Sequence, residues 1–230
     1  MRIVSPVLLA ALLTLSAPGG LLADSIPTLT VTGTASVAVT PDLATLSLGV
    51  TTQADTAGAA MTANSTALKA VIARLQAAGI AARDYQTSNL SLNPNWVSNA
   101  AGTGNEVHGY IAGNMLTIRV RALDQVGAVL DAAIADGANT LNGLTFGLQD
   151  PRPSQDEARK QAVADAVARA KLIATAAGTK LGAIISINEG GIDPQMPGPM
   201  FRMAADAAVP VAQGEVEISA SVTMVFELAK

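Results

Sequence analysis

The last stretch of the chain alternates apolar and polar side chains. Apolar residues occupy every second position from Val216 to Leu228, and glutamate, serine or threonine fills most positions between them. A period of two is the spacing of a β-strand, because successive side chains point to opposite faces of the sheet. One face of this strand is therefore predicted to be buried and the other to face water. That combination is typical of an antiparallel sheet covered by helices on one side.

The same alternation recurs earlier in the chain. It runs from Leu29 to Val39, returns from Ala44 to Val50 after a turn at residues 40–42, and appears again from Leu116 to Val120. Less regular apolar runs predict further strands over residues 85–92, 141–148 and 181–189.

Three segments have apolar residues at helical spacing instead: Asp55–Ala78, Leu123–Asp136 and Ser154–Ala177. A glycine follows each of them, as expected where a helix ends in the left-handed conformation. In the third segment Ser154 and Glu157 match a capping box, which predicts that the helix begins there. Its predicted buried stripe consists of Val163, Ala166, Ala170, Ile173 and Ala177.

The predicted elements repeat the order strand, helix, strand, strand on either side of the central helix. We interpret this order as an α+β fold of two α/β sandwich lobes, built from repeated β-α-β-β units with mostly antiparallel sheets and helices on one face. The lobes are expected at about residues 28–121 and 122–230, and sharing of strands across that boundary is left open.

The N-terminus has the layout of a secretory signal peptide over residues 1–23. Arg2 supplies the positive charge, Val7–Leu15 is apolar, and the small residue Ala23 precedes a cleavage point before Asp24. The alternative is an uncleaved N-terminal anchor. No later segment has the roughly 20 continuous apolar residues of a membrane span, so the mature chain is expected in the periplasm without a transmembrane segment.

Composition excludes several classes of partner and site. The chain has no cysteine, which rules out disulfides and thiol chemistry. Its net charge is −4 and no basic run occurs, so nucleic acid is not an expected partner. Anionic lipid is not an expected partner for the same reason, while peripheral association with the envelope is left open.

Catalytic motifs are missing from the sequence. The single histidine, His108, cannot form a histidine metal cluster, and neither a G-x-S-x-G elbow nor a phosphate-binding glycine loop is present. The carboxylates are scattered and form no acid/base pair. We therefore predict that the protein is not an enzyme and has no catalytic residue, cofactor or metal site. An enzyme that uses these carboxylates is a further alternative.

Two long segments are predicted to be loops, residues 93–107 and 190–214. The second is rich in proline and methionine, and adaptable methionine-rich surfaces recur at interfaces. Its candidate interaction residues are Met196, Met200, Phe201 and Met203. A linker with incidental methionines is the alternative. Trp96 and Tyr110 could line a small-molecule pocket, or they could be packing residues at a sheet edge.

Several segments resemble the SIMPL-domain family in their order and spacing. They are Asp84–Pro94, Gly109–Tyr110, Asn114–Arg121, Gly137–Asn139 with Asn142–Phe146, Ala158–Lys171 and Val222–Leu228. The resemblance covers about residues 28–230. It implies an exported periplasmic or envelope protein with two α/β sandwich lobes that self-associates. Some members are immunogenic antigens and some are linked to oxidative-stress defence, but the family supplies no catalytic residue to carry over.

The leading hypothesis is a non-enzymatic periplasmic protein that forms a homo-oligomer and acts in envelope or oxidative-stress protection. The alternative is a periplasmic module that binds a small ligand between the lobes, near Trp96 and Tyr110.

Deletion of residues 195–213 tests the role of the methionine-rich loop. The deletion is expected to weaken self-association, measured as solution mass by light scattering after size exclusion, because it removes the apolar contact residues. An oligomer of unchanged mass would contradict a role for this loop.

Overall fold

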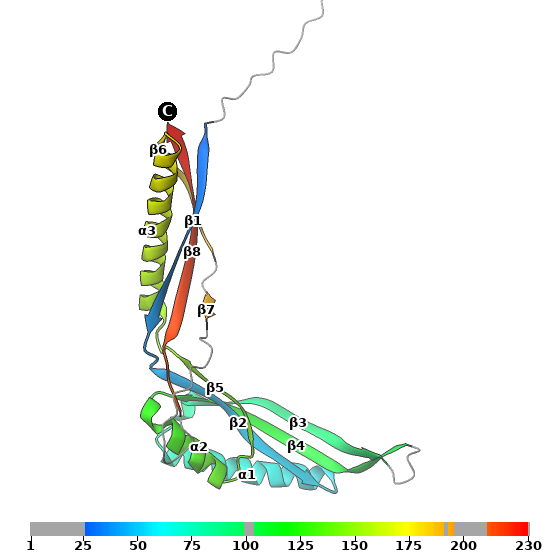
Figure 1. Cartoon of the computed structure of the whole chain (residues 1–230). Helices are drawn as coiled ribbons and strands as arrows, with labels where there is room; N and C mark the ends of the chain where they lie inside the picture. Colours follow the sequence, from blue (N-terminus) through cyan, green and yellow to red (C-terminus); the bar gives the residue numbers. More distant parts are fainter. Residues whose placement is uncertain (1–25, 99–103, 191–192, 196–210, 230) are drawn as a thin grey trace, which may run out of the picture.

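Two antiparallel sheets and three α-helices make up the part of the chain that the computed structural model describes, residues 26–98, 104–190, 193–195 and 211–229. The two sheets form separate arms of an elongated molecule (Figure 1). Each sheet carries its helices on one face, so the α+β class and the antiparallel sheets with helices packed against them are confirmed. The predicted signal peptide lies outside the described residues.

The first sheet pairs the two ends of the described chain. Strand β8 (Val216–Ala229) lies in the middle, between β1 (Thr28–Val39) and β6 (Lys180–Glu189). The short strand β7 (Asp193–Gln195) pairs with β8 further along. Helix α3 (Arg152–Ala176) packs along this sheet.

The second sheet has the strand order β3-β4-β2-β5. Its strands are β2 (Leu43–Ala54), β3 (Tyr85–Ser98), β4 (Asn105–Val120) and β5 (Thr140–Gly147). Helix α1 (Ala57–Ala77) packs on β2 and β4, and α2 (Val126–Ala135) packs beside α1. Short 3-10 turns precede β3 and α2, at Ala82–Asp84 and Leu123–Gln125.

The two sheets are not formed separately from the residues before and after the expected lobe boundary at residues 121 and 122. Strand β1 belongs to the sheet of β8, whereas α2 and β5 remain with the sheet of β2. The second β-α-β-β unit is therefore split, because its first strand lies in the other sheet. The N-terminal strand β1 supplies the third long strand of the first sheet in its place.

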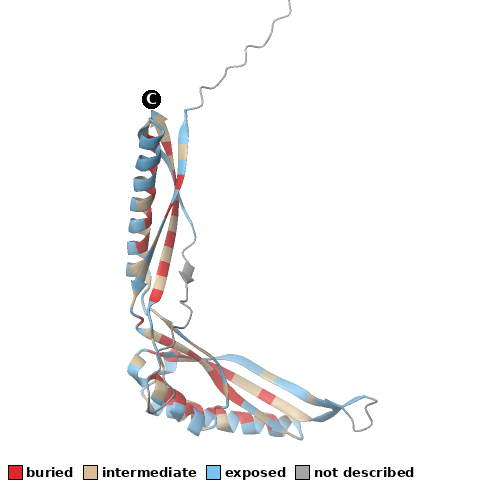
Figure 2. Ribbon diagram, in the orientation of Figure 1, coloured by how far each residue is buried: buried red, intermediate tan, exposed pale blue. Residues whose placement is uncertain are grey.

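Each arm has its own apolar core. The burial of β8 alternates as its sequence does, with Val216, Ile218, Val222, Met224 and Phe226 among the buried positions. The second core lies between the β2-β4 face and helices α1 and α2. Phe146 of β5 packs against both cores and so joins the arms through apolar contact. Figure 2 shows the buried residues as two stripes, one along each arm.

The fully buried side chains of helix α3 are all alanines, and Val163 and Val167 pack beside them half-buried. The buried residues recur every four positions: Ala158, Ala162, Ala166, Ala170 and Ala174. The predicted stripe was therefore only half right, because Ile173 and Ala177 are exposed. Small side chains let the helix backbone approach the sheet so closely that a Cβ atom added at Gly33 of β1 would lie 2.1 Å from the Ala162 carbonyl oxygen.

Two other sequence predictions need correction. Helix α3 begins at Arg152 instead of Ser154, and the carboxylate of Asp150, not a serine, accepts the hydrogen bond from the first helical N–H. The predicted loop over residues 93–107 is mostly strand, because β3 continues to Ser98 and β4 starts at Asn105. Pro94 and the asparagines around it are unfavourable in a central strand but are tolerated here, because β3 is an edge strand.

A chain of polar side chains ties the second sheet to the connections between the arms. Arg121 donates to the Asp84 carboxylate from two nitrogens: its Nε is shared between the two carboxylate oxygens, and its Nη2 donates to Oδ1 at 2.7 Å. Its Nη1 donates to Gln149 between β5 and α3, at 2.5 Å. Gln149 in turn donates its backbone N–H to the Asp42 carboxylate between β1 and β2, at 2.6 Å.

We expect Gly33→Ala to lower the free energy of unfolding by about 1 to 3 kcal/mol, because the new methyl group collides with the α3 backbone. Urea unfolding measures the change. The matched control is Gly58→Ala in α1, where a Cβ meets nothing within 4 Å and alanine favours the helix. Equal stability of the two variants would show that the α3 contact is loose.

The Asp84 pair predicts a pH effect. Hydrogen bonds from Arg121 are the main cause that holds the pKa of Asp84 below its ordinary 3.8, and the charges of Arg83 and Arg119 act in the same direction. A lowered carboxyl pKa stabilises the fold above the unfolded value, and that stability is lost as pH falls through the folded value.

Asp84→Asn is therefore expected to destabilise the protein near pH 7 and to differ less from the natural chain below about pH 4. Urea unfolding near pH 7 and near pH 3 tests this. A stability difference that does not change with pH would contradict the ionic role of Asp84.

Candidate functional site: the open strand edges

The outer edge of β1 is covered by helix α3. The backbone N–H of Thr34 donates to the Asp165 carboxylate at 2.9 Å, and Arg169 donates to the Thr32 carbonyl oxygen at 3.4 Å. The Thr34 hydrogen bond is the main cause that lowers the pKa of Asp165, and Arg169 adds to it. Side chains of α3 thus satisfy part of the β1 backbone and occupy the space that another strand would need.

The opposite edge of the same sheet, β6, has no such cover in the described structure. Ile184, Ile185 and Ile187 are each 50% to 57% exposed, although isoleucine is normally among the most buried residues. No charged residue lies between Lys180 and Glu189. Natural proteins usually protect an edge strand with charges, proline or irregular pairing, and β6 has only two register irregularities.

The register explains why these isoleucines are exposed. Ile184 lies opposite Phe226, and Ile187 lies opposite Met224. Directly opposed residues share a face of the sheet, and both partners are buried in the core under α3. The apolar face of the sheet therefore extends beyond the helix onto β6. Helix α3 contacts β1 and β8 more extensively than β6, and it leaves Ile184 and Ile187 exposed.

The far end of β6 is fixed by an ion pair. Arg159 of α3 donates to Glu189 at 2.6 Å and to Asp156 at 2.6 Å. The Glu189 hydrogen bond is the first cause of the raised pKa of Arg159. Both partners are partly exposed, so the pair contributes little to stability. Glu189 is also the charged residue at which the uncharged stretch of β6 ends.

Strand β3 is a second open edge, on the other arm. It contains no charged residue from Tyr85 to Ser98. The hairpin of β3 and β4 reaches beyond helix α1 (Figure 1). Leu90, Leu92, Trp96 and Val97 of β3 are exposed, as is Val107 of β4. Among the described strands β3 is the last of its sheet, so the hairpin arm, defined as residues 90–98 and 105–110, combines an edge strand with exposed apolar side chains.

Trp96 and Tyr110 both lie on this hairpin arm. Trp96 is opposite Val107 and is 60% exposed, while Tyr110 is opposite Pro94 and is half-buried. The register shifts between these two pairs, next to Gly109, whose positive φ suits an irregular strand position. The proposed ligand role of Trp96 and Tyr110 stays a prediction.

The methionine-rich segment is only partly described. Its first residues form β7, paired with residues 217–219 of β8, so this part is strand and not loop. Met196, Met200, Phe201 and Met203 lie outside the described residues.

Sequence reasoning missed the two open edges as candidate sites. The sequence signal for β6 was present, since Leu181–Ile187 is apolar without strict alternation. Such a run predicts a strand buried on both faces. The pattern alone does not distinguish a buried strand from an exposed apolar edge strand.

Within the described ranges no three histidine, aspartate or glutamate side chains are grouped as metal ligands. His108 is exposed on β4. Among the described helices, none is both long and apolar enough to cross a membrane.

Comparison with known proteins places these features in a family. The SIMPL family, described as "Protein of unknown function (DUF541)", matches residues 29–226. The chain belongs to the SIMPL family. It is 39% identical over 209 residues to the 26 kDa periplasmic immunogenic protein of Brucella melitensis. The aligned region covers 86% of this chain and 83% of that protein. It is 30% identical to the uncharacterized protein YggE of Escherichia coli K12, over 88% of this chain and 83% of YggE.

Proposed function

We propose that this SIMPL-family protein is a non-enzymatic periplasmic protein that acts by assembling with further copies of itself in the cell envelope. The observation that carries the proposal is the β6 edge, where Ile184 and Ile187 continue the buried apolar face of the sheet into solvent. The periplasmic location is supported by the name of the Brucella relative and by the signal-peptide pattern of residues 1–23.

A second copy suits the β6 edge better than an unrelated charged partner. The edge is uncharged between its ends, and among the described strands none pairs with the outer side of β6, next to its aliphatic side chains. Another uncharged edge strand can satisfy both at once, through backbone hydrogen bonds and apolar burial. This chain itself supplies such an edge in β3.

The positions of the two edges favour an assembly larger than a pair. Strands β6 and β3 belong to different sheets, one on each arm. Each copy can therefore bind two neighbours at separate places. Pairing of β6 with β3 of the next copy would be a head-to-tail contact, and such contacts close into rings or extend into filaments.

Protection of the envelope is the role that we attach to the assembly. A part in oxidative-stress defence would be indirect, because the chain has no cysteine and only seven methionines that oxidants could modify. An assembly that covers or bridges envelope components needs no reactive side chain.

Ile187→Lys on β6 tests the proposal. The natural protein is expected to show a defined multimer by light scattering after size exclusion. The variant is expected to shift to a mass of fewer copies, because the lysine places a charge in the apolar contact. The matched control is Ile134→Lys on α2, an isoleucine of similar exposure, 52%, away from both edges.

The two results separate the parts of the proposal. A monomeric natural protein would refute assembly as the function. A multimer that Ile187→Lys leaves intact would refute the role of β6. Circular dichroism of both variants is expected to match the natural protein, since neither isoleucine is buried in the single chain.

A further inference from the structure

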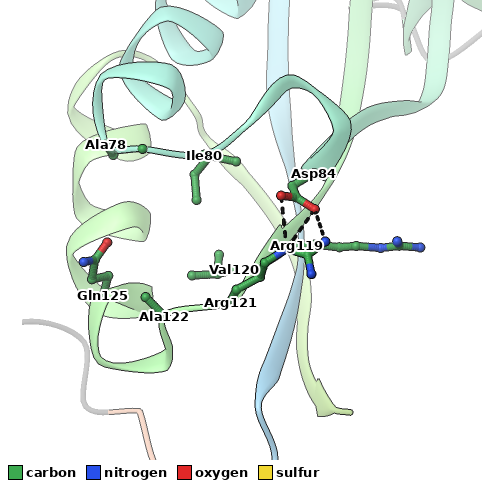
Figure 3. Close-up of a pocket in the computed structure, with 9 residues that line it drawn as sticks. Ala78, Ile80, Asp84, Arg119, Val120, Arg121, Ala122 and Gln125 are labelled. Atoms are coloured by element: carbon green, nitrogen blue, oxygen red, sulfur yellow. Dashed lines mark hydrogen bonds and ion pairs between the residues drawn. The ribbon is translucent and has the colours of Figure 1, made fainter. Parts of the chain in front are cut away.

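A hollow of about 360 Å³ lies where the second sheet meets the ends of its two helices. Its walls come from the turn after α1, from the end of β4 and from the segment that leads into α2 (Figure 3). Its accessible lining is mixed: Ala78, Ile80 and Ala122 supply apolar side chains, and Asp84, Arg121 and Gln125 supply polar groups. A volume of this size is in the range of small-molecule sites.

Some N–H groups of the Arg121 side chain have no acceptor among the described residues. A guanidinium group carries five N–H donors. Within the described residues, Nε and one Nη2 hydrogen are directed to Asp84, and one Nη1 hydrogen is directed to Gln149. Two N–H groups therefore have no assigned protein acceptor. The side chain is 41% exposed, so a ligand can reach it, while Asp84 holds its orientation from a nearly buried position.

The charges around the hollow favour an anion. The charged residues that line the hollow are Arg119, Arg121 and Asp84. Two guanidinium groups therefore stand against one carboxylate, in a chain whose net charge is negative. Arg119 points away from Ile80 and Gln125 in Figure 3, whereas the Arg121 guanidinium lies beside Asp84, and both of these residues line the hollow.

We propose that this hollow binds a small amphipathic carboxylate, with its carboxylate on the outer N–H groups of Arg121 and its short apolar chain against Ala78, Ile80 and Ala122. A guanidinium recognises a carboxylate through paired N–H donors, which a point charge cannot reproduce. The apolar walls distinguish this ligand from inorganic anions, which gain nothing from contact with aliphatic carbon. The site is separate from both strand edges and does not depend on the assembly proposal.

Binding of a ligand to Arg121 is expected to affect the hydrogen bonds that position the segments connecting the two arms. Arg121 is the residue that contacts Gln149, and Gln149 is bonded to Asp42 in the neighbouring connection. A ligand that shares the Arg121 guanidinium therefore acts on the same group that positions these two connecting segments.

Calorimetric titration of the purified protein with hexanoate tests the site. We expect saturable binding of one hexanoate per chain, on the order of 1 mM or tighter. Hexanol, which lacks the carboxylate, and inorganic phosphate, which lacks the chain, are each expected to bind at least about tenfold more weakly. Hexanol binding as tightly as hexanoate would refute the role of Arg121, and phosphate binding as tightly would refute the role of the apolar walls.

Variants locate the binding. Arg121→Lys keeps the positive charge beside Asp84 but removes the paired donors, and it is expected to weaken hexanoate binding at least about tenfold. Arg83→Lys is the matched control, since Arg83 is exposed and does not line the hollow. Ile80→Trp is expected to abolish binding by filling the space. Hexanoate affinity unchanged in Ile80→Trp, or no saturable binding to the natural protein, would overturn the proposal.

Discussion

The antiparallel ladder between β1 and β8 is the interaction on which the architecture depends. It joins Thr28 to Glu227 at one end and Val39 to Val216 at the other, so the first and last described strands become neighbours. Helix α3 packs on this pair, and its alanines fit closely only because Gly33 leaves room in β1. Without β1 the sheet would consist of β8 with β6 and β7, and the apolar face under α3 would lose Val31.

The position of α3 over β1 also decides which edge of the sheet is left open. The helix supplies Asp165 and Arg169 to the β1 backbone and leaves the β6 isoleucines uncovered. One long helix cannot cover three twisted strands at once. The asymmetry therefore follows from a single helix packing against a sheet, and the uncovered strand is the surface that the assembly proposal uses.

The apolar patterns of the sequence predicted the helices and strands well, but they did not predict which strands pair with one another. Alternation in β1, β2 and β8 was sufficient to place these strands, because burial of one face leaves a mark at every second residue. The ends of α3 and the β3–β4 hairpin were less predictable. Asp150 could replace the expected serine cap, and Pro94 is accepted in a strand because only the tertiary pairing makes β3 an edge. The Asp84–Arg121 pair joins groups far apart in the chain, so no local pattern could reveal it.

The sequence by itself determined the α+β class, the antiparallel strands and the approximate helix positions, because these depend on local periodicity and on glycines that end helices. Its segments also marked the SIMPL family, which the comparison confirmed. Only the tertiary structure decided that β1 joins β8, that β5 returns to the sheet of β2, and that β6 and β3 remain open edges. The physical reason is that a strand's side chains record which faces are buried, whereas its edge is defined by backbone hydrogen bonds that every residue except proline can make in full.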